Sequence, residues 1–416
     1  MTTRAITLAF AFAIIAACDE GSAPPSRSAA IATPAPVART DAADLIAKFE
    51  CSRCHDIPQV APAPLIKHCV HCHQEIHAGT FAVDALPDAT DAPVRAVDAS
   101  ILARWQGRIS SLRWAPSLAA ADRLRRSWVR DFLLAPHDVR PGLVAEMPRL
   151  AITRDEAERL AAHLVPERDG HGIAVNSAIT KRGADLYRSL ACGRCHRFTG
   201  AAADDAALHA SGRDHVEPLG GSWALAPDLR HARMRMDPVQ IAAWIADPRG
   251  AMPRLGIADD DARALATFIS TTPLAAPSPA PVIERRPVLA RAVTWDEVEA
   301  KVFRRVCWHC HAVPDFARGD GGPGNSGGFG FAPRGLDLSS YTGISAGSLD
   351  DAGEPRSVFT ALPDGTPRII AHLLARHTEE AGSTVPGIRG MPLGLPPLPL
   401  DDIQLVETWI SQGRPR

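Results

Sequence analysis

The chain has 416 residues, of which 46% are hydrophobic and 22% are charged, with a formal net charge of -2. This composition excludes a disordered tail protein, and the near-zero charge excludes a nucleic-acid binder that works through bulk positive charge. At roughly 150 residues per domain, the length predicts about three domains. Nine cysteines are an odd number, so disulfide bonds cannot account for all of them.

The N-terminus has the pattern of an export signal. An apolar run follows Arg4 and is shorter than the about 20 residues that a membrane-spanning helix needs. The end of the run, Ile15-Ala16-Ala17-Cys18, resembles the lipobox of bacterial lipoproteins. We therefore expect a lipoprotein signal peptide at 1–18, lipidation of Cys18, and a flexible tether rich in Ala, Pro and Ser at 19–40. An ordinary signal peptide that is cleaved nearby is the alternative.

The other eight cysteines form four C-x-x-C-H pentads, far more than chance supplies. Two thiols one helical turn apart can add to the two vinyl groups of a haem, and the histidine that follows then lies under the iron as its proximal ligand. We therefore predict four covalently attached haem c groups. The attachment cysteines and proximal histidines are Cys51, Cys54 and His55; Cys69, Cys72 and His73; Cys192, Cys195 and His196; and Cys307, Cys310 and His311.

Two other interpretations of a C-x-x-C pair explain less of the pattern. Zinc sites use such pairs, but they do not require a histidine directly after each second cysteine. A redox dithiol motif explains neither the four histidines nor the lack of a strand-helix context.

The pentads and the export signal resemble those of multihaem c-type cytochrome lipoproteins. An order of helix, pentad, loop, Met-Pro turn and helix occurs three times and resembles the class I cytochrome c fold. The resemblance implies an all-α protein with three small cytochrome c-like domains joined by Pro/Ala-rich linkers. Composition places a dihaem domain at 41–165, a monohaem domain at 176–270, a linker at 271–289 and a second monohaem domain at 290–416.

The first domain contains two pentads but one Met-Pro turn, at Met147. A helix is expected at 44–50, and Thr153 with Glu156 predicts a capping box for the helix that follows the turn.

The resemblance implies methionine as the distal iron ligand of one haem and histidine as that of the other. In a pattern similar to that of small multihaem cytochromes, His77 is assigned to the first haem and Met147 to the second. His68 is a rival to His77, and the helix at 44–50 would instead align the first haem with Met147.

The second domain, with a helix at 180–190, carries more of the family pattern. Gly183 and Tyr187 resemble the usual helix-crossing residues, and Met252 resembles the distal ligand of the haem on His196. Pro227 resembles the proline whose carbonyl accepts the proximal imidazole N–H. Pro116 and Pro333 occupy corresponding places in the other two domains.

In the third domain, helices are expected at 294–306 and 401–410, and Met391 is implied as the distal ligand of the haem on His311. The Gly-rich run at 319–330 is expected to be a loop along a haem edge. Asp259 and Asp401 are predicted N-caps of the helices after Met252 and Met391. Met234 and Met236 are expected to be packing residues.

Because every haem has a candidate distal ligand, the sequence predicts an electron carrier rather than an enzyme. The expected protein is a lipid-anchored tetrahaem cytochrome c on the periplasmic side of a bacterial membrane, relaying single electrons between redox protein partners. The alternative is a dihaem-type cytochrome c peroxidase or another haem enzyme, because the first domain allows more than one assignment of its distal ligands. A redox or gas sensor ranks last, because no signalling domain is visible.

Overall fold

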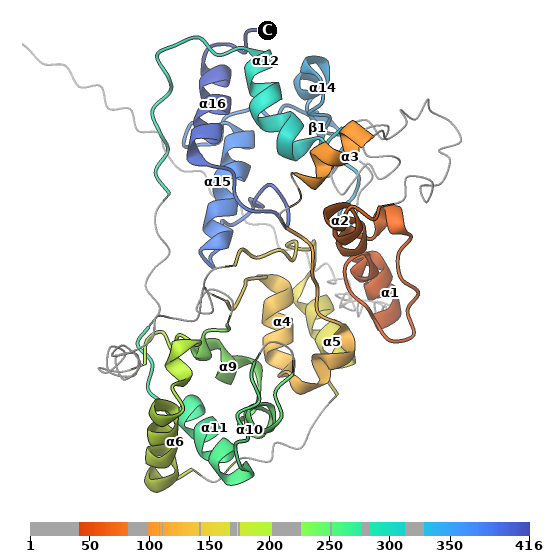
Figure 1. Cartoon of the computed structure of the whole chain (residues 1–416). Helices are drawn as coiled ribbons and strands as arrows, with labels where there is room; N and C mark the ends of the chain where they lie inside the picture. Colours follow the sequence, from red (N-terminus) through yellow and green to blue (C-terminus); the bar gives the residue numbers. More distant parts are fainter. Residues whose placement is uncertain are drawn as a thin grey trace, which may run out of the picture. The chain divides into compact units, whose positions relative to one another are not determined.

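The computed structural model describes residues 41–81, 99–107, 109, 111–140, 143–166, 173, 175–201, 226–249, 252–276, 283–312 and 328–416. The expected signal peptide, the lipidation site Cys18 and the tether lie outside these residues, as do parts of the linker and of the Gly-rich run. The described chain is helical apart from a short antiparallel pair of strands, β1 (Ser348–Leu349) and β2 (Pro355–Arg356), in which Ser348 pairs with Arg356. This architecture confirms the all-α fold class (Figure 1).

Within the described ranges, no helix combines the length and the apolar character that crossing a bilayer requires.

The first segment, the described part of 41–165, has its core where α1 (Ala42–Lys48) and α4 (Arg126–Leu134) pack against α5 (Arg154–Leu164). The buried side chains of Leu45, Phe49 and Leu160 lie in this core. The predicted capping box is confirmed: Glu156 N–H donates to Thr153 Oγ1 (3.3 Å), and Thr153 N–H donates to Glu156 Oε2 (2.9 Å). The elements are α1 (Ala42–Lys48), η1 (Cys51–Arg53), η2 (Leu65–Lys67), α2 (Cys69–Ala78), α3 (Ala99–Gln106), η4 (Leu118–Arg123), α4 (Arg126–Leu134) and α5 (Arg154–Leu164).

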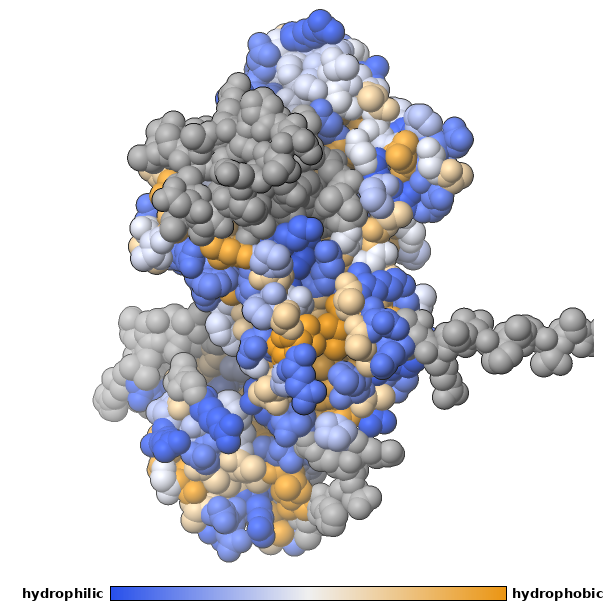
Figure 2. Space-filling view, turned by 90° about the vertical axis from the view of Figure 1, so that its right-hand side faces the viewer, coloured by the Kyte–Doolittle hydropathy of each residue, from blue (hydrophilic) through white to orange (hydrophobic). Residues whose placement is uncertain are grey.

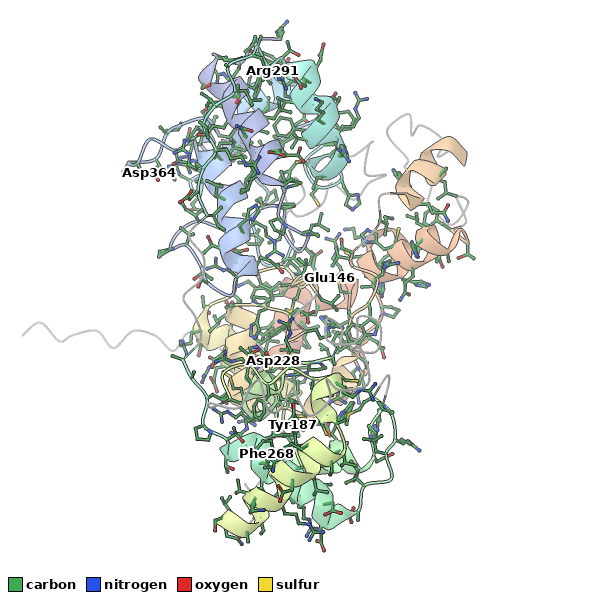
Figure 3. All side chains as sticks on the ribbon, turned by 60° about the vertical axis from the view of Figure 1, so that its left-hand side comes forward. Glu146, Tyr187, Asp228, Phe268, Arg291 and Asp364 are labelled. Atoms are coloured by element: carbon green, nitrogen blue, oxygen red, sulfur yellow. The ribbon has the colours of Figure 1, made fainter. Side chains whose placement is uncertain are left out.

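The second segment is built on a close helix crossing. Gly183 of α6 lies so near α11 that a Cβ there would clash with the Ala264 carbonyl, which confirms its predicted role. Tyr187 packs beside Phe268, with ring centroids 5.5 Å apart (Figure 3). The elements are α6 (Ser177–Ser189), η5 (Cys192–Arg194), α9 (Leu229–Arg235), α10 (Pro238–Ala246) and α11 (Asp259–Thr271).

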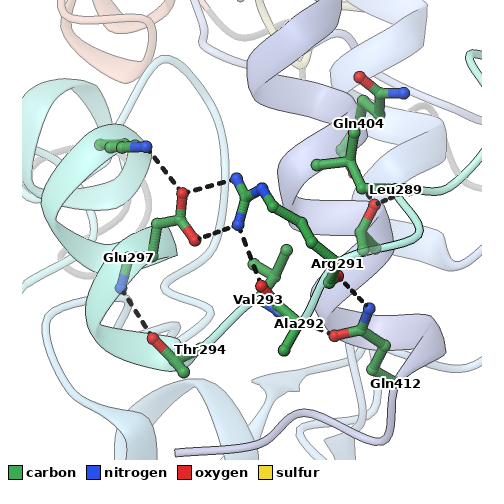
Figure 4. A network of polar contacts seen from close by, with 10 residues as sticks. Leu289, Arg291, Ala292, Val293, Thr294, Glu297, Gln404 and Gln412 are labelled. Carbon is green, nitrogen blue, oxygen red and sulfur yellow. Dashed lines mark hydrogen bonds and ion pairs between the residues drawn. The ribbon is translucent and has the colours of Figure 1, made fainter.

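The third segment packs around the fully buried Trp409, whose ring lies 5.5 Å from that of Trp295. The stretch that precedes its first helix is hydrogen-bonded to Gln412, directly after α16 (Leu400–Ser411). Val293 N–H donates to Gln412 Oε1 (2.9 Å), and Gln412 Nε2 donates to Arg291 O (2.8 Å) (Figure 4). The elements are α12 (Trp295–Val298), which continues as the π-helix η6 (Glu299–Cys307), α14 (Tyr341–Ala346), α15 (Arg368–Glu380) and α16 (Leu400–Ser411).

Two predicted helix caps are wrong. The N-cap of α11 is Ala258 and that of α16 is Pro399, and neither Asp259 nor Asp401 makes a capping hydrogen bond. Both aspartates lie in the first turn instead, where a negative charge still interacts favourably with the positive end of the helix dipole.

The first and third segments share a core. Phe329 is buried among the side chains of the first segment, and Leu393 packs against the same cluster. Two hydrogen bonds hold this junction: Ala151 N–H donates to Phe329 O (3.0 Å), and Phe329 N–H donates to the side-chain Oε2 of Glu50 (3.3 Å). Residues far apart in sequence therefore build the surroundings of the first pentad.

On the face shown in Figure 2, hydrophilic residues predominate and apolar residues gather between them. Among the described residues, the large apolar side chains with the most exposure include Trp114 and Met234, and Arg140 lies over the Trp114 ring at 5.6 Å. Met234 is 57% exposed, so its predicted packing role is wrong, whereas Met236 packs against the core of the second segment.

Candidate functional site

The first and third pentads have nearly the same backbone. Each begins after a residue in the left-handed region, Glu50 with φ 51° and Ala191 with φ 52°, and each first cysteine opens a single 3-10 turn. In both, the histidine N–H donates to the first cysteine's carbonyl at 3.0 Å. The turn therefore places both thiols and the imidazole around one small volume.

In the other two pentads, longer helices bring the two thiols and the imidazole together. Cys69 opens α2, so the second pentad forms the first turns of that helix. Cys307 ends the π-helix η6, and His311 N–H donates to Cys307 O at 2.8 Å.

Three of the predicted proximal histidines share one hydrogen-bond arrangement. In each, Nδ1 lies close to a backbone carbonyl oxygen: 2.8 Å from Pro227 for His196, 2.8 Å from Pro116 for His55 and 3.1 Å from Ser111 for His73. An Nδ1–H that donates to a carbonyl leaves the lone pair of Nε2 to bind a metal. Burial also lowers the pKa of all three imidazoles, which favours the neutral form that binds iron.

Two of these acceptors correspond to prolines named from the sequence, Pro227 and Pro116. Ser111 was not foreseen, because no proline marks it and it lies 38 residues from His73. A carbonyl is present at every residue, so only the folded chain shows which one reaches the ring.

The fourth imidazole, that of His311, is different. Burial lowers the pKa of this imidazole to about 4. The backbone of Leu336 lies near the ring, but Nδ1 has no well-aligned hydrogen bond among the described residues, so the expected Pro333 carbonyl does not hold it. The His311 carbonyl accepts from Leu338 N–H at 2.6 Å, which ties the pentad to the following loop.

The thiols suit thioether formation better than zinc binding. Burial raises the pKa of Cys51 and Cys192 to about 11 and that of Cys307 to about 12. A zinc site needs thiolates, whereas the product of addition to a vinyl group is a neutral sulfur. Among the described residues, no group of three or more His, Cys, Asp or Glu side chains is arranged to hold a metal ion. The chemistry of these side chains therefore fits haem c.

Neighbouring pentads lie close to one another. Cys54 of the first hydrogen-bonds Cys69 of the second, and this contact with burial raises the pKa of Cys54. The ring centroids of His73 in the second pentad and His309 in the fourth are 6.4 Å apart. This contact of His309 could not be foreseen from the sequence, because its partner lies far away along the chain.

The predicted methionine ligands lie in loops beside the cores. Met147 packs partly buried against the core of the first segment, and Met391 does so against that of the third. His372 holds the latter loop: its Nδ1 lies 2.7 Å from Arg389 O, and its own carbonyl accepts from Met391 N–H at 2.9 Å. Met252 is partly buried in the loop before α11.

The candidate histidine ligands of the first segment both have polar partners. His77 lies four residues after His73 in α2, and its Nε2 is 2.7 Å from Arg113 Nη1. Nδ1 of His68 accepts from His71 N–H at 3.1 Å and caps the same helix. The assignment of His77 over His68 stays a prediction.

Comparison with known families identifies the second segment. Residues 178–269 match the family model of cytochrome c oxidase, cbb3-type, subunit III. No curated protein and no solved structure matches the chain. The match contains the crossing at Gly183, the pentad ending at His196, the Pro227 carbonyl and Met252. Residues 178–269 are therefore a class I c-type cytochrome domain, which implies covalently bound haem c and haem-based electron transfer.

Proposed function

We propose that the whole protein is a tetrahaem cytochrome c that relays single electrons between a donor and an acceptor protein. The observation that carries this proposal is that the contact between histidine Nδ1 and a backbone carbonyl also occurs outside the matched family segment. His55 and His73 each meet a backbone carbonyl through Nδ1, as His196 does within it. The same local chemistry at separate pentads favours the same cofactor at each.

Bound haem would supply a one-electron iron couple at each pentad. The chain's own part is to hold it: eight cysteines form the thioethers, and four histidines bind the iron from the proximal side. Met147, Met252 and Met391 are the proposed sulfur ligands, which raise the reduction potential relative to histidine, and His77 is the proposed nitrogen ligand. The carbonyls at Pro116, Ser111 and Pro227 keep three imidazoles in the orientation and tautomer that iron binding needs.

The contacts between pentads support a relay rather than separate sites. The Cys54–Cys69 contact brings the first two attachment sites together, and the His73–His309 contact brings the second and fourth together. Haems on these sites would lie near one another, as transfer of single electrons through the protein requires.

We further propose that lipid on Cys18 anchors the protein to the periplasmic side of a bacterial membrane. The support is the sequence pattern: the apolar run after Arg4, the lipobox-like Ile15–Cys18 and the Pro/Ala-rich tether at 19–40. Two or more acyl chains hold a protein on a membrane more stably than one does.

The test is a haem count and a redox titration on the purified full-length protein. We expect the mass of four haems above that of the chain and its lipid, and one-electron steps for four centres. Replacing both cysteines of one pentad by serine should remove one haem and one step. A mass that shows fewer haems in the wild-type protein would overturn the proposal.

Two further measurements test the proposed lipid anchor and the alternative function, one each. Cys18→Ser should release the protein from membranes without changing its haem content. The purified protein should show no sustained turnover of hydrogen peroxide, and such turnover would favour a dihaem-type peroxidase instead.

A further inference from the structure

The loops that carry Met147 and Met391 meet at one carboxylate. Glu379 of α15 is 8% exposed, and its Oε1 accepts two hydrogen bonds. One comes from Arg149 Nη1 at 3.0 Å, and the other comes from Gly390 N–H at 2.9 Å. Arg149 lies two residues after the first methionine, and Gly390 directly precedes the second.

Other bonds between the two segments surround this contact. Arg389 Nη1 donates to Leu150 O at 2.8 Å and also to the carbonyl of Arg149, and its guanidinium lies 4.1 Å from the ring centre of Phe331. Arg376, 4% exposed on α15, donates through Nη2 to Ala145 O and through Nε to Leu395 O, both at 2.7 Å.

Each methionine is therefore bracketed by these contacts. Bonds to Ala145 and Arg149 lie on the two sides of Met147, and bonds to Gly390 and Leu395 lie on the two sides of Met391. A shift of either loop would take a hydrogen bond from the buried carboxylate of Glu379, which is more costly than losing a bond at the surface. The loops are thus expected to hold one common position.

We propose that Glu379 is a positioning residue that fixes the two methionine loops as one element, so that the haems they serve respond together. The inference rests on the proposed sulfur ligation by Met147 and Met391. It adds that the potential and the sulfur ligation of either haem depend on side chains in the other segment.

The experiment uses the full-length haem-loaded protein, with redox titration and the charge-transfer absorption that marks sulfur ligation of ferric haem. Met147→Leu and Met391→Leu first assign the two signals. If neither variant changes that absorption, the proposed ligation fails, independently of the coupling.

With the signals assigned, Glu379→Gln removes a buried negative charge beside both loops. Both assigned potentials should shift in the positive direction, because the loss of a nearby negative charge disfavours ferric haem. The potential of the haem assigned to Met252 should stay constant. Glu407→Gln is the matched control, because Glu407 is a similarly buried carboxylate of the third segment that pairs with Arg285. It should leave both potentials unchanged.

The cross-response is the sharpest test and does not require the Glu379 variant to fold. Arg149→Gln lies in the Met147 loop but should shift the potential of the haem assigned to Met391. Arg389→Gln lies in the Met391 loop but should shift the potential of the haem assigned to Met147. A merely local structural role would alter only the haem of the substituted loop, and that result would overturn the proposal.

Discussion

The carbonyl oxygen of Pro227 lies 2.8 Å from Nδ1 of His196, across 31 residues of sequence. The buried carboxylate of the next residue, Asp228, holds this loop by accepting from Thr199 N–H at 3.1 Å and from Arg230 N–H at 2.9 Å (Figure 3). The position of the proximal imidazole therefore depends on a side chain that does not touch it.

Asp228→Ala should lower the free energy of unfolding by about 1–3 kcal/mol, because it removes the cap of α9 and the acceptor of two backbone N–H groups. Asp228→Asn keeps an oxygen acceptor and should lose less. Denaturant unfolding of the haem-loaded protein measures the difference. Equal stability of the alanine variant and the wild type would contradict this account of the loop.

Gly183→Ala should disrupt the crossing of α6 and α11, because the added Cβ would meet the Ala264 carbonyl and Phe268 Cβ. Overpacking of this kind costs typically about 1–3 kcal/mol, and more where the contact is backbone, which cannot rotate away. Thermal unfolding measures the loss. Lys181→Ala is the control on the same helix: this exposed residue pairs with Asp185 at 2.9 Å, so a change within about 0.5 kcal/mol is expected.

Met252→Ala should remove the proposed sulfur ligand of the haem on His196 and lower its reduction potential, because thioether ligation raises the potential relative to histidine. Redox titration with absorption spectroscopy measures both effects. Met234→Ala is a matched control, since that side chain is 57% exposed, and it should leave this potential unchanged. Retained sulfur ligation in the Met252 variant would show that another residue binds this iron.

Glu297→Gln should make the third segment less stable in a pH-dependent way. Arg291 bonds both carboxylate oxygens, at 2.7 and 2.8 Å, and Lys301 adds a third contact at 2.7 Å (Figure 4). These partners lower the pKa of Glu297 from 4.5 to about 2. Because the ion pair lies at the surface, with the Arg291 side chain 52% exposed, the pairing is worth only about 0.2–1 kcal/mol.

The sign of the effect follows from the lowered pKa. The stabilisation by Glu297 is fully present above its ordinary value of 4.5 and is lost as the pH falls through its folded value of about 2. Unfolding curves of the variant and the wild type should therefore differ at neutral pH and converge near pH 2. Glu354→Gln, at an exposed residue with no ion pair among the described residues, is the control. A difference that grows toward acid pH would show that the pairing is wrongly described.

The helices before the pentads and after the Met-Pro turns could be predicted from the sequence, with ends that differ by one to three residues, whereas α4, α10 and α15 were not foreseen. The expected helix at 44–50 is observed at Ala42–Lys48, and that at 401–410 is observed at Leu400–Ser411. The capping box at Thr153 was found because both of its partners lie within four residues. The caps at Asp259 and Asp401 were misplaced, because an acidic residue suits both the cap and the first turn, and only the backbone angles distinguish the two.

By itself, the sequence determined the local chemistry of the four pentads, because two thiols and an imidazole within five residues are brought together by a single turn of any helix. Tertiary structure alone decided which carbonyl meets His73 and that one carboxylate, Glu379, binds both methionine loops. These contacts join residues between 11 and 230 positions apart. The packing of whole helices, rather than any short spacing, sets the distances between their atoms.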